Sequence, residues 1–333
     1  MGSFLQIGEL SVIPSWAGFL VCAAGVALAG LRLAWVADAL AARHGLPRSL
    51  VGMGLVGVVT SLPELTTGIA AMLEDLPDLA VGSVLGSLIF NMVILLVLLI
   101  SLRFKGGSAS EAMLTVPPVS LSGIILINLW VVLVLFWPET HAWSKAWPVL
   151  TFPGLVILMG CCGVVVLGGQ GEARNEGTSA EIGEEDPDEA PAVSTHGARE
   201  PAEWVVFQGL AASVSIVGLG AWLPLWAQQV AALMGWSSTA MGTTFVAITT
   251  SLPELASTLG AVRLGAIDLA VGNLLGSNLF NLAILALNDG IQAPPGLWAV
   301  IATEHRYNAL VSLLMHAGLW VALSRSGSCA RSP

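Results

Sequence analysis

The chain has 333 residues, of which 55% are hydrophobic and only 10% are charged. Soluble domains carry about 25% charged residues, so this composition excludes an ordinary soluble domain and indicates a polytopic membrane protein. Residues 172–203 account for −8 of the net charge of −10, and the rest of the chain is nearly neutral. No basic nucleic-acid-binding surface is therefore expected, and the expected surroundings are a lipid bilayer.

Long apolar runs follow one another along most of the chain. Each run is close to the roughly 20 residues that a helix needs to cross about 30 Å of hydrocarbon. Because lipid accepts only helices or closed barrels, and the runs are too long for barrel strands, we predict an all-α bundle of nine transmembrane helices. The predicted spans are 16–38, 49–73, 78–102, 115–137, 148–169, 204–232, 238–262, 267–288 and 303–324. Segment 289–302, which contains Pro294 and Pro295, is too short and too broken to predict a tenth span.

An acidic segment, 171–203, separates a first half, 1–170, from a second half, 204–333. The segment contains ten acidic residues and only two arginines, and it has no aromatic residue. This composition predicts a disordered linker, which is either a flexible connection between the halves or a regulatory segment that binds an ion or a partner. Cytoplasmic loops are enriched in Lys and Arg. With the N-terminus outside, nine basic loop residues fall on the inner side and two on the outer side. We therefore predict a multi-pass protein of the cell (inner) membrane with a cytoplasmic linker.

The two halves contain an internal repeat. Segments 51–97 and 241–287 align without gaps, and 21 of the 47 aligned positions are identical, including SLPEL, DLAVG and FN. The first copy begins at the second predicted span and the second copy at the seventh, so an odd number of helices separates them. The copies should therefore be inverted in the membrane. Inverted repeats with helices broken near the midplane are the architecture of secondary transporters.

Each copy places a proline and a glutamate inside a predicted span, as Pro63–Glu64 and Pro253–Glu254. A proline has no N–H, so the carbonyl four residues earlier loses its helical partner and the helix breaks or kinks. Such carbonyls persist at membrane depth where they are buried in protein or line a polar cavity. A cation in that cavity would satisfy both the carbonyls and the glutamates.

Further oxygen-bearing side chains recur at i, i+4 spacing on the broken helices and on the helices that follow them. Carboxylate, amide, hydroxyl and carbonyl oxygens suit hard cations such as Ca²⁺, and the lack of His and Cys in the set disfavours zinc or copper. Two ionised glutamates can be neutralised by one Ca²⁺ or by two Na⁺. Glycine pairs Gly82/Gly86 and Gly272/Gly276 would let the helices approach closely. The candidate metal ligands are Glu64, Glu254, Asn91, Asn281, Thr60, Thr250, Ser61, Ser251, Ser87 and Ser277.

The motifs VVTSLPEL with GSVLGSLIFN, and AITTSLPEL with GNLLGSNLFN, resemble the two alpha repeats of the sodium/calcium exchanger family of the calcium:cation antiporters. The resemblance implies a ten-helix transporter with a Ca²⁺ site flanked by Na⁺ sites. It also implies alternating access, in which the first and sixth helices slide across the others. By motif match, Ca²⁺ would bind Glu64, Glu254 and carbonyls near Thr60 and Thr250. This chain departs from the pattern in its nine predicted helices and in Leu88, which stands where the second copy has Asn278.

The predicted function is secondary active cation antiport, with Na⁺-driven Ca²⁺ exchange as the leading interpretation. Ca²⁺ and Na⁺ are then transported ions, and no prosthetic group is expected. No zinc-protease HExxH motif and no GxSxG nucleophile motif occurs, so we do not predict an enzyme. Exchange coupled to H⁺, exchange of another divalent cation, and a degenerate or passive cation pathway remain open. His305 and His316 are predicted to be interface or packing residues, and the sequence indicates no protein partner.

Overall fold

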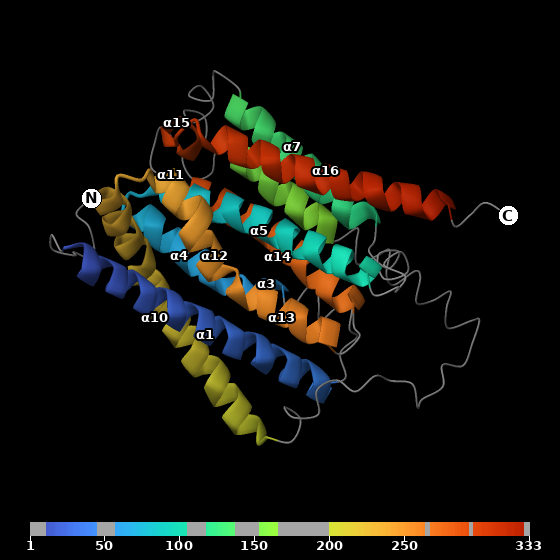
Figure 1. The fold of residues 1–333 in the computed structure, drawn as a ribbon, viewed down its shortest axis with the longest axis horizontal. Coiled ribbons are helices and arrows are strands. Elements are labelled where there is room, and N and C mark those ends of the chain that lie inside the picture. Colours follow the sequence, from blue (N-terminus) through green and yellow to red (C-terminus); the bar gives the residue numbers. More distant parts are fainter. Residues whose placement is uncertain are drawn as a thin grey trace.

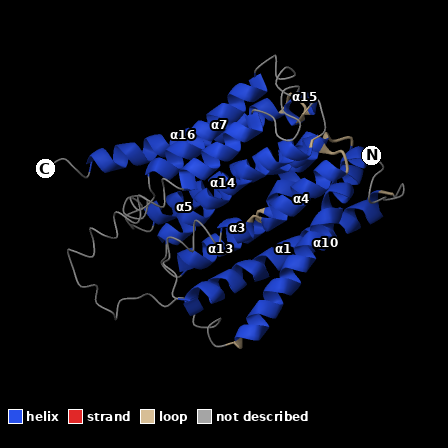
Figure 2. Cartoon of the chain, turned by 180° about the vertical axis from the view of Figure 1, so that it is seen from behind, coloured by secondary structure: helices blue, strands red, loops and turns tan. Residues whose placement is uncertain are grey.

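The structure, a computed structural model, describes residues 11–44, 57–104, 118–136, 153–165, 200–263, 267–292 and 296–329. Within these ranges the chain forms helices, some of them joined by short turns, and it contains no strand (Figure 2). Each of the nine predicted spans contains a helix. Most of the predicted linker, 171–199, lies outside the described residues, and a helix begins at Ala202, inside the predicted linker boundary.

Four of the described helices are long and apolar enough to cross a membrane, and a bent pair of helices adds a fifth crossing. Shorter apolar helical stretches of 10–17 residues are Leu62–Leu73, Leu121–Phe136 and Pro153–Val165, and these lie within three more of the predicted spans. The segment predicted not to span contains the single-turn helix α15 (Leu297–Val300). The long helices are α1 (Val12–His44), α5 (Pro77–Phe104), α7 (Pro118–Phe136), α10 (Ala202–Met234), α14 (Ile267–Ile291) and α16 (His305–Cys329).

The predicted helix breaks are confirmed in both copies of the repeat. In the first copy, Ser61 separates α3 (Gly57–Thr60) from α4 (Leu62–Leu73). In the second copy, Ser251 separates α12 (Ala247–Thr250) from α13 (Leu252–Arg263), and the helix bends by 41° at this break. The two serines have nearly the same backbone angles, φ −88° and ψ 9° against φ −91° and ψ 8°. The proline after each break therefore produces the same local geometry twice.

The second copy also contains a feature that the sequence pattern does not predict. Between α11 (Ser238–Met241) and α12, residues Gly242–Val246 form a turn of π-helix, η4. Single π-helical turns inside α-helices are rare overall, and those that occur are often found at functional sites. This turn leads directly into the broken segment of the second copy.

The helices form three groups (Figure 1). Helices α1 and α10 pack mainly against each other along one side, and α7 and α16 pack together along the opposite side. The elements of the repeats lie between these pairs, with α5 and α14 in contact at the centre. The chain runs from α3 to α4 in the direction opposite to its passage from α11 to α13, as predicted for inverted repeats (Figure 1). The fold is thus an inverted-repeat helix bundle with peripheral helix pairs.

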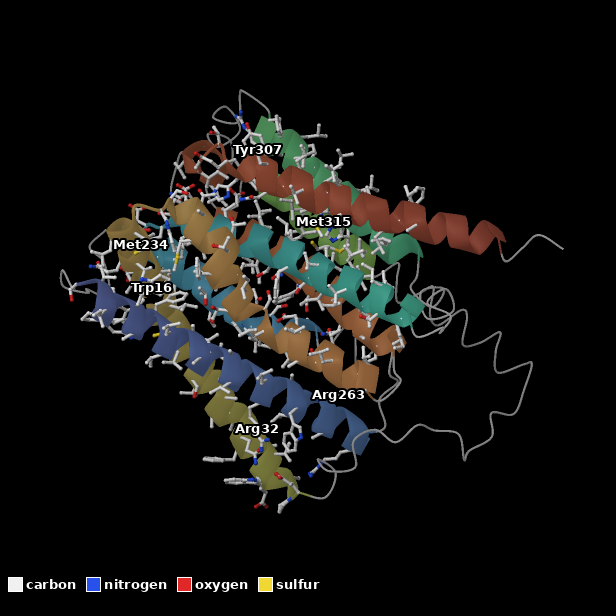
Figure 3. All side chains as sticks on the ribbon, viewed as in Figure 1. Trp16, Arg32, Met234, Arg263, Tyr307 and Met315 are labelled. Atoms are coloured by element: carbon white, nitrogen blue, oxygen red, sulfur yellow. The ribbon has the colours of Figure 1, made fainter. Side chains whose placement is uncertain are left out.

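Aromatic and basic side chains join α1 to its neighbours at separate points along its length (Figure 3). Near one end, the Trp16 ring packs edge-on against Phe245 of η4, with 5.7 Å between ring centroids. Toward the other end, the Arg32 guanidinium lies 4.0 Å from the Trp35 ring centroid and donates a hydrogen bond to Gln208 of α10. Arg32, a basic residue inside a predicted span, is therefore paired with α10.

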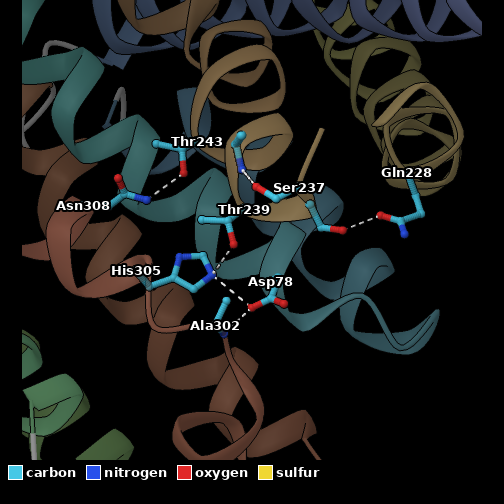
Figure 4. A network of polar contacts seen from close by, with 10 residues as sticks. Asp78, Gln228, Ser237, Thr239, Thr243, Ala302, His305 and Asn308 are labelled. Atoms are coloured by element: carbon cyan, nitrogen blue, oxygen red, sulfur yellow. Dashed lines mark hydrogen bonds and ion pairs between the residues drawn. The ribbon is translucent and has the colours of Figure 1, made fainter. Parts of the chain in front are cut away.

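Polar contacts fasten the start of α16 to the repeat core (Figure 4). The Asp78 carboxylate accepts hydrogen bonds from the Ala302 backbone N–H at 2.6 Å and from His305 Nε2 at 3.2 Å. Thr239 Oγ1 of α11 lies 3.4 Å from the same imidazole nitrogen. Asp78 and the predicted packing residue His305 therefore form a network that joins α5, α11 and α16.

Candidate ion-binding site

All ten candidate ligands lie in the interior, and the side chain of each has a relative exposure of 0%. They come from the two broken helices and from the helices that follow them, α5 and α14. We call these ten residues the central polar cluster. A group of ten polar side chains at the centre of an apolar bundle needs internal partners, because an unpaired buried polar group costs about 1–3 kcal/mol.

The two glutamates are held by serines that belong to the opposite copy of the repeat. Ser251 Oγ donates to Glu64 Oε1 at 2.8 Å, and Ser61 Oγ donates to Glu254 Oε1 at 3.0 Å. Each donor is the residue at a helix break, and each acceptor lies just beyond the other break. The inverted repeats therefore bring the two carboxyl groups into one cluster through reciprocal contacts.

The serines and threonines of the following turns complete the cluster. Ser87 Oγ lies 3.4 Å from Glu64 Oε1 and 2.9 Å from Ser251 Oγ. In the other copy, Ser277 Oγ donates to the Gly57 carbonyl at 3.3 Å and lies 3.3 Å from Thr60 Oγ1. The hydroxyls of both threonines also lie near carbonyls of their own helices: Thr60 Oγ1 is 3.3 Å from the Gly57 carbonyl oxygen, and Thr250 donates to the carbonyls of residues 246 and 247. Eight of the ten side chains therefore contact the facing copy of the repeat. Of the other two, Asn281 has no side-chain partner among the described residues, and Thr250 hydrogen-bonds to its own helix.

Several oxygens of the cluster have no hydrogen-bond partner among the described residues. They are Glu64 Oε2, Glu254 Oε2, Asn91 Oδ1 and Asn281 Oδ1, and Asn281 Nδ2 is unpaired as well. Each glutamate thus uses one carboxylate oxygen for a serine and leaves the other available. Buried carboxylate and amide oxygens without a donor are the oxygens that a hard cation would coordinate.

The chemistry of the cluster favours a cation with oxygen ligands. The described residues contain no group of three or more His, Cys, Asp or Glu side chains placed to hold a metal. The cluster instead combines two carboxylates with amide and hydroxyl groups, all of which supply the oxygen ligands that hard cations prefer.

Sequence reasoning missed two residues next to the cluster. Asn278 of α14 accepts a hydrogen bond from Asn91 Nδ2 through its Oδ1 at 3.0 Å. The Nδ2 atom of Asn278 lies 3.0 Å from His316 Nε2 of α16. The available signal was the asymmetry between the copies, since Leu88 occupies the position equivalent to Asn278. Nothing in the local sequence of α16 connects His316 to the repeats.

Buried carboxylates at paired helix breaks within inverted repeats define a membrane transporter of the cation-exchanger class. The family model described as sodium/calcium exchanger protein matches residues 14–167 and 204–323, and the chain belongs to this family. The resemblance drawn from the repeat motifs is therefore confirmed.

Relatives and solved structures agree with this assignment. The inner membrane protein YrbG of Escherichia coli is 31% identical over 294 residues, which cover 87% of this chain and 83% of YrbG. Among solved structures, the H⁺/Ca²⁺ exchanger CAX has a TM-score of 0.67 at 13% identity, over 94% of this chain and 77% of CAX. The sodium-calcium exchanger NCX_Mj has a TM-score of 0.52 at 17% identity, over 94% of this chain and 91% of that one. At these identities the two structures establish a shared fold, and the chain is a multi-pass membrane protein of that fold.

Proposed function

We propose that this protein is a secondary active antiporter that exchanges Ca²⁺ for Na⁺ by alternating access, with the central polar cluster as its ion site. The observation that carries the proposal is the reciprocal pair of contacts, in which each buried glutamate accepts a hydrogen bond from the serine of the opposite helix break. Both copies of the repeat must be in place to build this pair. A site shared by two inverted copies can be opened to either side of the membrane.

The charge of the cluster supports exchange over one-way passage. Glu64 and Glu254 are fully buried, and moving an uncompensated carboxylate through the membrane costs at least about 2.5 kcal/mol. One Ca²⁺ or two Na⁺ would neutralise both carboxylates, whereas the empty ionised site would not be neutral. The transporter should therefore change sides readily with either cargo and rarely without one.

The helix arrangement supports a sliding movement of α1 and α10. These two helices pack more extensively against each other than against any single element of the repeats. A pair that holds together by its own contacts can shift as a unit while the ion site stays intact. We infer the orientation with the N-terminus outside from the excess of basic residues in the loops predicted to be cytoplasmic.

Reconstitution in liposomes tests the exchange. Vesicles loaded with Na⁺ and diluted into Na⁺-free buffer should take up ⁴⁵Ca²⁺, and uptake should stop when Na⁺ is equal on both sides. Uptake that depends on an imposed pH gradient and does not depend on Na⁺ would show that H⁺, and not Na⁺, is the coupling ion. Uptake without any counter-ion would contradict antiport and favour a passive pathway.

Removal of a break serine should weaken cation binding without removing charge. In Ser251→Ala, Glu64 loses its 2.8 Å donor and its carboxylate is free to rotate away from the site. Hydrogen bonds to charged groups contribute about 1.5–3 kcal/mol, so the half-saturating Ca²⁺ concentration should rise roughly 10- to 100-fold. Ser61→Ala should give a similar result through Glu254.

The matched control for these serine variants is Ser215→Ala. Ser215 is exposed on α10, and its hydroxyl donates only to the Ala211 carbonyl in the contacts described. This variant should keep the wild-type half-saturating concentration. An equal effect in Ser215→Ala, or no effect in either break serine, would remove the assigned role of the reciprocal contacts.

A further inference from the structure

We propose that His316, on the last helix, is a positioning residue that orients the Asn91 amide so that its oxygen faces the ion site. The inference rests on the proposed function, because it concerns a ligand of the same site. His316 belongs to α16, which lies outside both repeat copies. Its side chain is fully buried, so its polar atoms must find partners inside the protein.

The hydrogen bonds of His316 determine which of its nitrogens carries the proton. His316 Nδ1 lies 2.8 Å from the Ser312 carbonyl oxygen, which can only accept a hydrogen bond. Nδ1 must therefore donate. In the neutral imidazole, Nε2 is then the acceptor.

The same reasoning then orients Asn278. Its Nδ2 lies 3.0 Å from His316 Nε2 and 3.5 Å from the Leu88 carbonyl oxygen, and both of these atoms are acceptors. The amide group of Asn278 must therefore point its NH₂ toward α16 and α5. Its Oδ1 is left to face Asn91.

Asn91 is oriented by this last contact. Asn91 Nδ2 donates to Asn278 Oδ1 at 3.0 Å, so Asn91 Oδ1 is directed elsewhere. That oxygen is buried and has no partner among the described residues, and Asn91 lies one helical turn beyond Ser87, which contacts Glu64. We call the sequence Ser312 carbonyl, His316, Asn278 and Asn91 the amide relay.

The amide relay exists on one side of the repeat only, within the described structure. The position equivalent to Asn278 in the first copy is Leu88, which is buried and cannot orient an amide. A reversed Asn91 would present its NH₂ group, a donor, to a bound cation and would repel it. The relay therefore prevents the wrong orientation at Asn91, in the way that partners of metal ligands orient those ligands in other proteins.

Calorimetric Ca²⁺ titration of the purified protein, together with ⁴⁵Ca²⁺ uptake by proteoliposomes, tests the relay. In His316→Leu, the Ca²⁺ dissociation constant should rise about 10- to 100-fold, which is the range found for residues that orient metal ligands. The maximal uptake rate at saturating Ca²⁺ should change far less than the half-saturating concentration. Asn278→Leu, which copies the residue of the first repeat, should reproduce this pattern, and the double variant should be no weaker than either single variant.

His316→Gln is the rescue variant. The glutamine amide oxygen can take the place of Nε2 and accept from Asn278, so most of the Ca²⁺ affinity should return. Ser312→Ala is the matched control, because it removes the hydroxyl bond to Asn128 at 3.0 Å but keeps the backbone carbonyl that receives His316. It should bind Ca²⁺ as the wild type does.

Three results would overturn the relay: wild-type affinity in His316→Leu, no recovery in His316→Gln, or an equal loss in Ser312→Ala. The last two would mean that His316 contributes packing alone. If the wild-type protein bound no Ca²⁺, the proposed function would fail together with the relay. If the wild-type protein bound Ca²⁺ and His316→Leu bound it equally, only the relay would fail.

Discussion

Glu254→Gln should abolish Na⁺-dependent Ca²⁺ uptake, with a loss of more than about 100-fold in the rate at low Ca²⁺, which is above the range for residues that act on a ligand indirectly. The glutamine side chain has nearly the same shape as the glutamate. Its amide oxygen can still accept the hydrogen bond that Ser61 Oγ donates to Glu254 Oε1 at 3.0 Å in the wild type. The fold should therefore be kept while one of the two buried negative charges is lost. A site with a charge of −1 cannot neutralise Ca²⁺, so the loaded transporter would carry an uncompensated charge through the membrane. ⁴⁵Ca²⁺ uptake into Na⁺-loaded vesicles measures this loss.

Two variants control for the change of carboxylate to amide. Glu64→Gln, in the other copy, should lose uptake to a similar extent, because each buried glutamate accepts a hydrogen bond from the break serine of the opposite copy. Glu203→Gln changes an exposed carboxylate in the first turn of α10 and should leave uptake unaltered. Near-normal exchange by Glu254→Gln would show that the buried pair does not hold the transported cation, and the proposed function would have to be abandoned.

Gly86→Ala should destabilise the protein and remove transport. A Cβ atom at residue 86 of α5 would lie 2.3 Å from the Thr243 carbonyl oxygen of η4 and 2.6 Å from the Ala247 side chain of α12. Backbone atoms cannot rotate aside, so α5 and the second broken helix would have to separate. Overpacking of this kind costs about 1–3 kcal/mol, and the separation would also displace Ser251 from Glu64. The thermal unfolding midpoint in detergent and the ⁴⁵Ca²⁺ uptake rate report the two effects.

Gly218→Ala is the matched control for this glycine. Residue 218 lies in the middle of α10, and a Cβ atom there would meet no atom within 4 Å. This change should leave transport intact and should stabilise the helix by up to about 1 kcal/mol, because alanine is the better helix former. If Gly86→Ala changed neither the unfolding midpoint nor the uptake rate, the close approach of η4 to α5 would not be required for stability or transport.

The helix breaks and the fold class were predictable because their causes are local. Pro63 and Pro253 lack the N–H that a continuous helix requires, and the structure breaks both helices two residues earlier, at Ser61 and Ser251. The gapless repeat and the odd number of intervening spans similarly predicted the inverted directions of the copies. The length of the apolar runs predicted helix at each of the nine spans.

The side-chain partners were not predictable from sequence spacing. The pattern placed Thr60 with Glu64, and Thr250 with Glu254, on shared faces of their own helices. The structure pairs each glutamate with the serine of the opposite copy, and the Thr250 hydroxyl returns to its own backbone. Such contacts depend on the rotation and register of two helices about 190 positions apart, and spacing within one helix does not determine these.

The sequence by itself determined that this is a duplicated helical membrane protein with two buried glutamates next to two helix breaks, because backbone chemistry and hydrophobic length act within one segment. Only the tertiary structure decided the π-helical turn before the second break, the Asp78–His305 contact and the link from His316 to Asn91. Hydrogen-bond direction in these networks depends on which acceptors neighbouring helices supply. Those helices meet through packing of side chains from distant parts of the chain, which no local pattern encodes.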